Sequence, residues 1–299
     1  MSPRRSGPSG AARVGPTPAS RTVREGTDTF PVTPRETYSH GHQDAVLRSH
    51  RWRTAENSAG HLLPHLRPTD RLLDVGVGPG TITADLARRL PAGTVLGVDN
   101  APAAVEATRT LVAQAGLENV QVEVADVYDL GLASGSFDVV HAHQVLQHLA
   151  DPVAALTELR RVRRPDGVVA VRDADYAAMT WYPASASLSR WLELYRAVAR
   201  ANGGEPDAGR RLHHWVQQAG FADVTSSASA WCFASAADLG WWTSTWAERL
   251  TASAFAGQAV DHGLTDVAEL TALADGWRAW GHQPGAWFSV LHGEVLARG

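Results

Sequence analysis

The chain has 299 residues and a formal net charge of −4, and every basic residue other than its histidines is an arginine, so no overall basic field favours nucleic acid as a partner. Its single cysteine, Cys232, excludes an internal disulfide, a zinc site built from cysteines and thiol chemistry that needs a cysteine cluster. No apolar run approaches the length of a membrane span or forms a secretory signal, so we expect a cytoplasmic protein of one large or two small domains.

The first residues differ in composition from the rest of the chain. Residues 1–32 are rich in Ser, Pro, Gly, Thr and Arg without periodicity, which predicts a disordered tail. Polar and aromatic residues become dense near Tyr38, and residues 33–69 are expected to form helices that end at Pro64 and Pro68.

A glycine-rich stretch follows, and the rest of the prediction depends on it. From Leu72 to Thr83 the sequence reads LLDVGVGPGTIT, an apolar run followed by three glycines at alternate positions and a helical pattern. This order predicts a buried parallel strand, a tight turn and a helix whose free N–H groups provide an electropositive end. Asp74, two residues before the first glycine, is placed where a strand-end carboxylate can reach into the crevice beside the turn.

The spacing of the glycines distinguishes between two kinds of nucleotide-binding loop. A dinucleotide-binding loop has the pattern G-x-G-x-x-G, but Thr81 stands where its third glycine would lie, and Gly80 comes one residue earlier. The order acid-x-Gly-x-Gly-x-Gly resembles motif I of the class I S-adenosylmethionine-dependent methyltransferases. The resemblance implies that the acid and the loop wrap the amino-acid end of this cofactor, the loop through Gly76, Val77, Gly78 and Gly80.

The same resemblance gives the segment 33–69 an expected role. In these methyltransferases a segment just before the core folds over the cofactor, which implies a lid here, with Tyr38 beside the cofactor and the reacting methyl group. The alternative interpretation is a solvated amphipathic helix that packs on the sheet.

The second predicted strand ends in a carboxylate. Thr94–Asp99 is an apolar strand whose last residue follows Gly80 by 19 positions. An acid at the end of strand two is placed to accept hydrogen bonds from both hydroxyls of a ribose. Asp99 is therefore the predicted ribose ligand, and the adjacent Asn100 is expected in the cofactor site.

The third predicted strand, residues 120–124, stops at a short polar segment after a helix over residues 101–115. By resemblance, Asp126 is the acid that contacts the exocyclic amine of adenine, with Ala125 beside it and the amide of Val127 facing a ring nitrogen. An acceptor next to a donor suits the edge of adenine. Asp129 is the competing candidate.

The fourth predicted strand, residues 136–143, runs into Val-Leu-Gln-His-Leu, which resembles the corresponding motif of small-molecule members such as the ubiquinone/menaquinone-biosynthesis methyltransferases. Strand ends in a parallel sheet face one crevice, so His143 and Gln144 are expected at the cofactor. His143 and His148 are candidate general bases or substrate-orienting groups. Alternatively, His148 only hydrogen-bonds the backbone of its loop.

The resemblance is dense up to a fifth strand at residues 168–173 and then stops. Two insertions, at about 176–205 and 236–284, interrupt the remaining strands, and ten of the eleven tryptophans lie after position 180. Tryptophans in insertions over the catalytic rim predict an apolar pocket, with two or three of the rings lining it and the others packed in the core.

Together these features predict an α/β fold: a Rossmann-like, seven-stranded, mostly parallel sheet with helices on both faces and helical cap insertions. The methyltransferase domain is expected to span 70–299, with its core at 70–175. The predicted function is transfer of a methyl group from S-adenosylmethionine to an O, N or C nucleophile of a small, partly apolar metabolite.

No metal is expected, because no His/Asp cluster has ligand spacing. A homodimer is compatible with the sequence. The alternatives are a nucleotide-dependent oxidoreductase, an RNA or protein methyltransferase, and a catalytically silent S-adenosylmethionine-binding scaffold.

Overall fold

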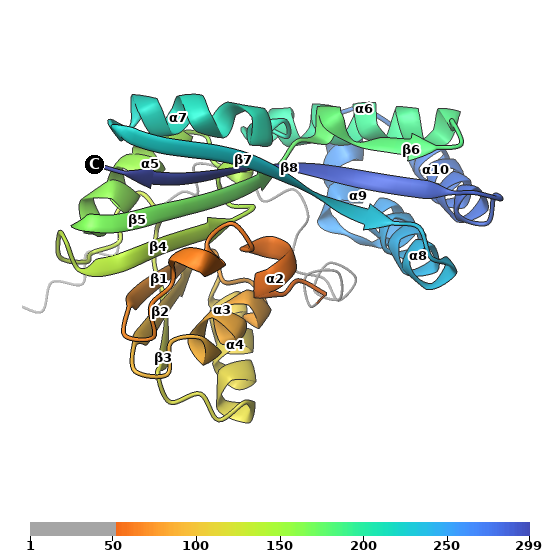
Figure 1. Ribbon diagram of the computed structural model, residues 1–299. Coiled ribbons are helices and arrows are strands. Elements are labelled where there is room, and N and C mark those ends of the chain that lie inside the picture. Colours follow the sequence, from red (N-terminus) through yellow and green to blue (C-terminus); the bar gives the residue numbers. More distant parts are fainter. Residues whose placement is uncertain (1–51) are drawn as a thin grey trace, which may run out of the picture. The chain divides into compact units, whose positions relative to one another are not determined.

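One mixed β-sheet organises the part of the chain that the structure describes, residues 52–299 (Figure 1). In this computed structural model the strand order is β3-β2-β1-β4-β5-β8-β6, and β7 also pairs with β8. Strands β1 to β5 are mutually parallel, and β8 runs antiparallel to β5, β6 and β7. The parallel strands are β1 (Arg71–Val75), β2 (Thr94–Asp99), β3 (Val120–Val124), β4 (Phe137–His143) and β5 (Arg163–Ala174).

Helices cover both faces of the parallel strands, because residues alternate between the two faces. Leu72 of β1 belongs to the same hydrophobic cluster as Leu86 of α3, whereas its neighbour Leu73 packs in the cluster that contains Leu156 of α5. The first face carries α2, α3 and α4, and the second carries α5 and α7. Their bounds are α2 (Ala55–Ser58), α3 (Thr81–Arg88), α4 (Pro102–Gln114), α5 (Pro152–Val162) and α7 (Leu212–Gln218).

Local sequence signals explain where these helices begin. The side chain of Asp151 caps α5 by accepting a hydrogen bond from the backbone N–H of Ala154 (2.9 Å). Pro152 and Pro102 each occupy the first position of a helix, where no N–H is needed. The helix predicted over residues 101–115 therefore begins within one residue of its predicted position.

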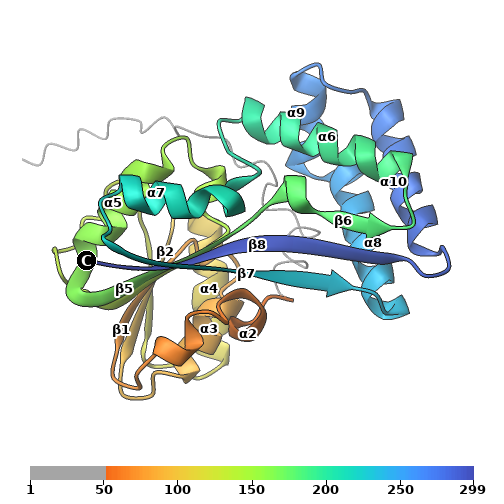
Figure 2. The same cartoon turned by 45° about the horizontal axis from the view of Figure 1, so that its top comes forward.

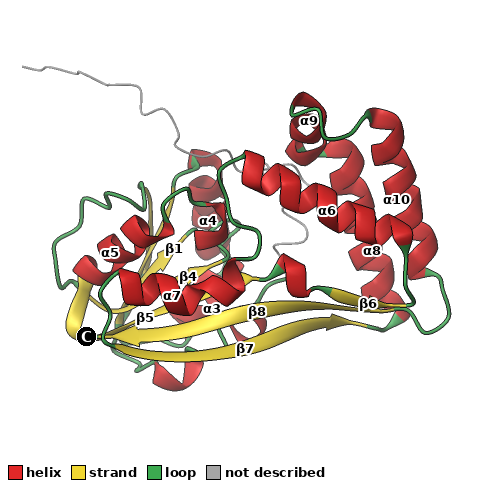
Figure 3. Cartoon of the chain, turned by 90° about the horizontal axis from the view of Figure 1, so that it is seen from above, coloured by secondary structure: helices red, strands yellow, loops and turns green. Residues whose placement is uncertain are grey.

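The strands β7 (Asp223–Phe233) and β8 (Trp287–Arg298) are long and run from the α/β core to a group of cap helices (Figure 2). Figure 3 shows these helices gathered away from α5 and α7. None of the helices between residues 52 and 299 has the length and apolar character needed to cross a membrane. The cap helices are α6 (Ala186–Ala201), α8 (Ala236–Ala252), α9 (Ala254–Asp261) and α10 (Val267–Gly281).

The expected α/β class and mostly parallel sheet are confirmed, but the predicted number of seven strands is wrong. The described residues form an eighth strand, β6 (Thr180–Tyr182), inside the segment expected to be only a cap. After β5 the chain passes through a 3-10 turn, η3 (Tyr176–Ala178), and returns to pair with the first residues of β8. Three residues are too few for an alternating pattern to reveal a strand.

The cap has a hydrophobic core of its own, built largely from tryptophans. Trp191 of α6 lies between Trp246 of α8 and Trp277 of α10, with ring centroids 4.4 and 4.8 Å away, and all three are buried. Trp280 and Phe288 complete this cluster. Their edge-to-face contacts favour a well-defined packing of α6, α8 and α10 against β8.

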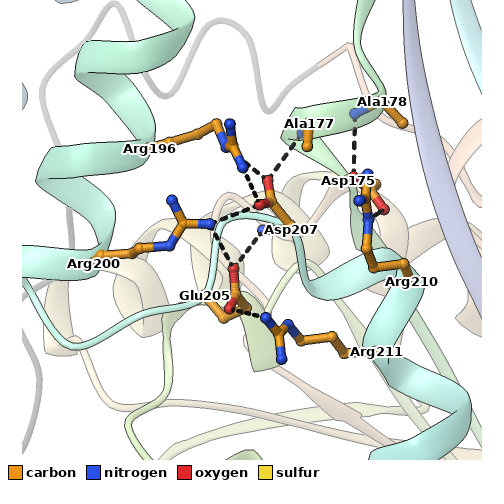
Figure 4. A network of polar contacts seen from close by, with 9 residues as sticks. All are labelled: Asp175, Ala177, Ala178, Arg196, Arg200, Glu205, Asp207, Arg210 and Arg211. Carbon is orange, nitrogen blue, oxygen red and sulfur yellow. Dashed lines mark hydrogen bonds and ion pairs between the residues drawn. The ribbon is translucent and has the colours of Figure 1, made fainter.

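A network of ion pairs connects the segment after β5 with α6 and with the 3-10 turn η4 (Ala208–Arg211), as Figure 4 shows. Buried Asp207 pairs with Arg196 and Arg200 of α6 at 2.6 and 2.7 Å. Asp175 forms a bidentate pair with Arg210, at 2.6 and 2.7 Å. The two carboxylates also accept hydrogen bonds from backbone N–H groups of η3, so the network holds this turn in place.

Candidate active site

A cleft of about 1230 Å³, including its open mouth, lies at the carboxyl ends of the parallel strands. Its walls are the glycine loop after β1, the end of β2, the loop after β3 and the end of β4. The residues expected in the cofactor site that line it are Gly76, Val77, Gly78, Asp99, Asn100, Ala125, Asp126, Val127, His143 and Gln144, and the candidate base His148 lines it too.

The three glycines of the loop are needed for two different structural reasons. All three have positive φ, but a Cβ on Gly76 would lie 2.4 Å from Val145 Cγ2, and one on Gly80 would lie 2.7 Å from Thr108 Cγ2. A Cβ on Gly78 would have no atom within 4 Å. Gly76 and Gly80 therefore permit close packing, whereas Gly78 presents bare backbone to the cleft.

Asp99 links the end of β2 to the glycine loop. Its Oδ2 accepts a hydrogen bond from the backbone N–H of Gly78 (3.0 Å), and its Oδ1 accepts one from the N–H of Ala101 (3.0 Å). Each carboxylate oxygen has a further lone pair, so the oriented group can still accept hydrogen bonds from a ligand.

The loop after β3 distinguishes between the two acids that the sequence left as alternatives. Asp126 lines the cleft, and its Oδ1 accepts a hydrogen bond from the backbone N–H of Tyr128 at 2.9 Å. Asp129 is not part of the lining, although its N–H donates to the carbonyl of Asp126. The geometry therefore favours Asp126.

Two described residues that were expected at the cofactor, Asp74 and Gly80, do not line the cleft. Asp74 is buried behind it, where Oδ1 lies 2.7 Å from His141 Nδ1 and Oδ2 accepts a hydrogen bond from Thr83 Oγ1 (2.6 Å). The expected direct contact is therefore corrected: Asp74 joins β1, β4 and α3 beneath the glycine loop. Gly80 packs against α4, and Tyr38 lies outside the described residues.

The two candidate histidines lie in different environments. His143, at the end of β4, is 5 % exposed, and neither ring nitrogen has a hydrogen-bond partner among residues 52–299. Burial, together with the positive charges of Arg172 and Arg53, holds its pKa well below the usual value, so the ring is neutral at pH 7 and both charges oppose its protonation. Burial also lowers the pKa of His148, to about 3, but its Nε2 lies 3.0 Å from the side-chain amide nitrogen of Gln147.

Gln144 adopts a left-handed backbone conformation (φ 53°) that is uncommon outside glycine. Its Oε1 accepts a hydrogen bond from Arg53 (2.6 Å), so its amide N–H faces His292 Nε2 at 2.9 Å. His292 must accept there, and its Nδ1–H donates to the carbonyl of Val290 (3.1 Å). These hydrogen bonds fix the orientation of the Gln144 amide at the edge of the cleft. The strained backbone of Gln144 is a further sign of a functional position, because such strain is common at active sites.

A second pocket, of about 400 Å³ including its opening to solvent, adjoins the cleft and shares Arg53 and Gln144 with it. We call it the aromatic pocket. Three tryptophans of α8 line it, in agreement with the two or three expected from the insertions, and Trp52 and Trp231 add two rings that the sequence did not predict. The tryptophans of α8 are Trp241, Trp242 and Trp246, and the remaining lining is Ala174, Tyr176, Met179, Arg249 and Val290.

Arg53 is the main site residue that sequence reasoning missed. The unusual density of arginine and tryptophan at residues 51–53 was the available signal, but nothing in the sequence shows that this segment meets β7. In the structure the indole N–H of Trp231 donates to the carbonyl of Asn57 (2.7 Å), and Arg53 lies 5.5 Å from the ring of Trp231.

Asp173 has a buried carboxyl group near the end of β5, and its ionisation is expected to make the stability of the fold depend on pH. Burial raises its pKa to about 8, while its Oδ1 accepts a hydrogen bond from the N–H of Gln147 (3.1 Å). The unfolded chain loses this proton near pH 4, so wild-type stability falls as the pH rises from about 4 to about 8. Asp173→Asn keeps the accepting oxygen and removes the ionisation.

We therefore expect Asp173→Asn to gain at least about 1.4 kcal/mol over wild type between pH 5 and pH 9, the equivalent of one pKa unit. The measurement is the free energy of unfolding in urea of both proteins at both pH values. Taking the difference between them cancels the contribution of the buried histidines. A difference that is the same at both pH values would contradict the prediction.

Comparisons with known proteins agree with this geometry. Residues 66–220, just over half of the chain, match the family model described as a methyltransferase domain. An uncharacterized methyltransferase of Schizosaccharomyces pombe is 33% identical over 268 residues, which cover 87% of this chain and 95% of that protein. A ubiquinone biosynthesis O-methyltransferase of Cereibacter sphaeroides is 36% identical over 99 residues, 33% of this chain and 39% of that protein.

Among solved structures, the YcgJ protein of Bacillus subtilis superimposes with a TM-score of 0.53 at 18% sequence identity, over 80% of this chain and 97% of that chain. At this identity the likeness shows the fold alone. The family model and the relative that matches over most of its length show more. The chain belongs to the Rossmann-like methyltransferases and uses S-adenosylmethionine as its methyl donor.

Proposed function

We propose that this enzyme methylates an O, N or C nucleophile of a small, partly apolar metabolite that binds in the aromatic pocket. The observation that carries the proposal is the junction of the two cavities. Arg53 and Gln144 line both the cleft at the strand ends and the aromatic pocket, so a cofactor in the first can meet an acceptor in the second. A recess lined by tryptophan rings suits the apolar part of a small molecule better than a folded macromolecule.

The residues of the cleft fit S-adenosylmethionine. The bare backbone at Gly78 leaves room for the methionyl end, and Asp99 has lone pairs for the two ribose hydroxyls. Asp126 and the N–H of Val127 offer an acceptor and a donor to adenine. When bound, the cofactor supplies an activated methyl group, and the chain itself has to position the acceptor and receive any proton it loses.

We infer that His143 is the group that receives this proton. It is neutral, lines the cleft and has no competing hydrogen bond among the described residues. His148 is the weaker candidate, because Gln147 donates to its Nε2, and Tyr38 stays a candidate from sequence alone. The nucleophile would lose its proton to His143 as its lone pair forms the new bond to carbon.

The test has two stages. The full chain is first incubated with methyl-labelled S-adenosylmethionine and a panel of small phenols, amines and carboxylic acids, and products are detected by mass spectrometry. With the acceptor found, His143→Ala is expected to lower kcat roughly a hundredfold, the usual contribution of a general base. The matched control is His213→Ala, since His213 is exposed on α7.

Label found only in RNA or protein would contradict a small-molecule acceptor. Binding of S-adenosylhomocysteine without turnover of any small acceptor would instead support a silent scaffold. An unchanged kcat in His143→Ala would remove the proton-accepting role from this residue alone.

A further inference from the structure

The aromatic pocket combines tryptophan rings with two positive charges. Arg249 of α8 is only 4 % exposed, and its guanidinium carbon lies 4.8 Å from the ring centroid of Trp246. Arg53 stands at the junction with the cleft. Among the described residues, the lining includes neither Asp nor Glu.

A third polar group of the pocket is also a donor. Trp242 is 5 % exposed, and its indole N–H has no hydrogen-bond partner among residues 52–299. An indole and a guanidinium can only donate hydrogen bonds. A ligand that satisfies the Trp242 N–H therefore needs an acceptor atom, and the positive charge of Arg249 favours an acceptor that is itself negatively charged.

The positive potential extends across the pocket. The positive charges of Arg249 and Arg53 both act to lower the pKa of the Tyr176 hydroxyl, although burial outweighs them and raises it overall. Charges act strongly in a cavity with apolar walls, because little water screens them. The pocket is thus electrostatically suited to an anion.

The two arginines occupy different ends of the pocket. Arg53 and Gln144 also line the cofactor cleft, whereas Arg249 lines the aromatic pocket alone. Methyl transfer therefore belongs at the Gln144 end, and Arg249 is the cation further from the reaction. A bound anion at Arg249 would be an anchor and not the attacking group.

We propose that the acceptor is a planar aromatic acid, whose carboxylate binds Arg249 and Trp242 and whose nucleophile faces the Gln144 end. The proposal rests on the proposed function. The rings of the pocket stack on the aromatic body, and the guanidinium forms charge-assisted hydrogen bonds with the carboxylate. In the reaction a lone pair of the acceptor forms the bond to the methyl carbon, the electron pair of the carbon–sulfur bond goes to sulfur, and the acceptor proton goes to His143. The carboxylate is unchanged.

The test uses pairs of aromatic acids and their amides. The probes are 4-hydroxybenzoate with 4-hydroxybenzamide, and 6-hydroxy-2-naphthoate with its amide. Each is titrated calorimetrically into the full chain saturated with S-adenosylhomocysteine. We expect at least one acid to bind tenfold or more tightly than its amide, and Arg249→Gln to abolish this preference by weakening only the acid.

Three further proteins serve as controls. Arg249→Lys keeps the charge and should retain part of the preference. Trp242→Phe removes one donor while keeping an aromatic ring, and should reduce the preference severalfold even if Arg249→Gln does not fold. Arg278→Gln changes an exposed arginine of α10 that pairs with Asp275, and should keep the full preference.

Equal binding of acid and amide in wild type, or no binding of either in both pairs, would overturn the proposal. So would a folded Arg249→Gln that keeps the preference. Failure of wild type to bind S-adenosylhomocysteine would instead count against the proposed cofactor site, so the two failures are distinguishable.

Discussion

Asp99→Ala is expected to weaken the binding of S-adenosylhomocysteine at least tenfold, a loss of roughly 1.5 to 3 kcal/mol. In the proposed site this carboxylate is the charged partner of both ribose hydroxyls. It also accepts the N–H groups of Gly78 and Ala101, so its removal loosens the glycine loop as well. Calorimetric titration of the ligand into wild type and variant measures the loss.

The matched control for this experiment is Asp129→Ala. Asp129 is an acid of the neighbouring loop that does not line the cleft, so its removal should leave the affinity close to that of wild type. An Asp99→Ala protein that binds S-adenosylhomocysteine as wild type does would show that the ribose lies elsewhere. Thermal unfolding of both variants separates a lost contact from a lost fold.

Gly293→Ala is expected to destabilise the protein by about 3 kcal/mol or more, and to lower Tm by about 6 °C or more. A Cβ on Gly293 of β8 would lie 2.0 Å from the carbonyl oxygen of Gly209 in η4. Both partners are backbone, so no flexible side chain can move aside. Relief requires η4 to separate from β8, which disturbs the adjacent ion pair between Asp175 and Arg210.

Gly257→Ala provides the control for that substitution. Gly257 lies in α9, has no positive φ, and a Cβ there would meet nothing within 4 Å. Alanine is favoured over glycine in a helix by up to about 1 kcal/mol, so this variant should be as stable as wild type or slightly more stable. Calorimetric unfolding of both variants makes the comparison, and equal Tm values for Gly293→Ala and wild type would contradict the close-approach argument.

The sequence predicted the cofactor half of the fold more closely than the acceptor half. The bounds of β2 and β3 agree with those predicted, because each is a short apolar or alternating run that ends at a polar segment. Strand β5 begins earlier than expected, at Arg163. The sequence predicted a start at residue 168, but Arg163 pairs with Phe137 beside a register shift, and the strand continues from there to Ala174.

The same contrast applies to the candidate site. Parallel strands bring their carboxyl ends together, so residues such as Asp99 and Asp126 could be grouped from topology alone. Asp74 was misplaced because a buried strand gives no signal for which face each residue occupies. The aromatic pocket joins Arg53 to Trp231 across 178 positions of sequence, and such packing is set by the tertiary fold and not by any local pattern.

Strands β7 and β8 belong to both hydrophobic cores. Val224 of β7 and Val295 of β8 pack with the core beside α5 and α7, while Phe233 of β7 and Phe288 of β8 pack with the tryptophans of the cap. For protein engineering, this continuity decides where the molecule can be recombined. A chimera that takes its cap from a relative with a different acceptor has to carry the two strands along. A junction placed inside either strand would mix side chains from two parents in both cores at once.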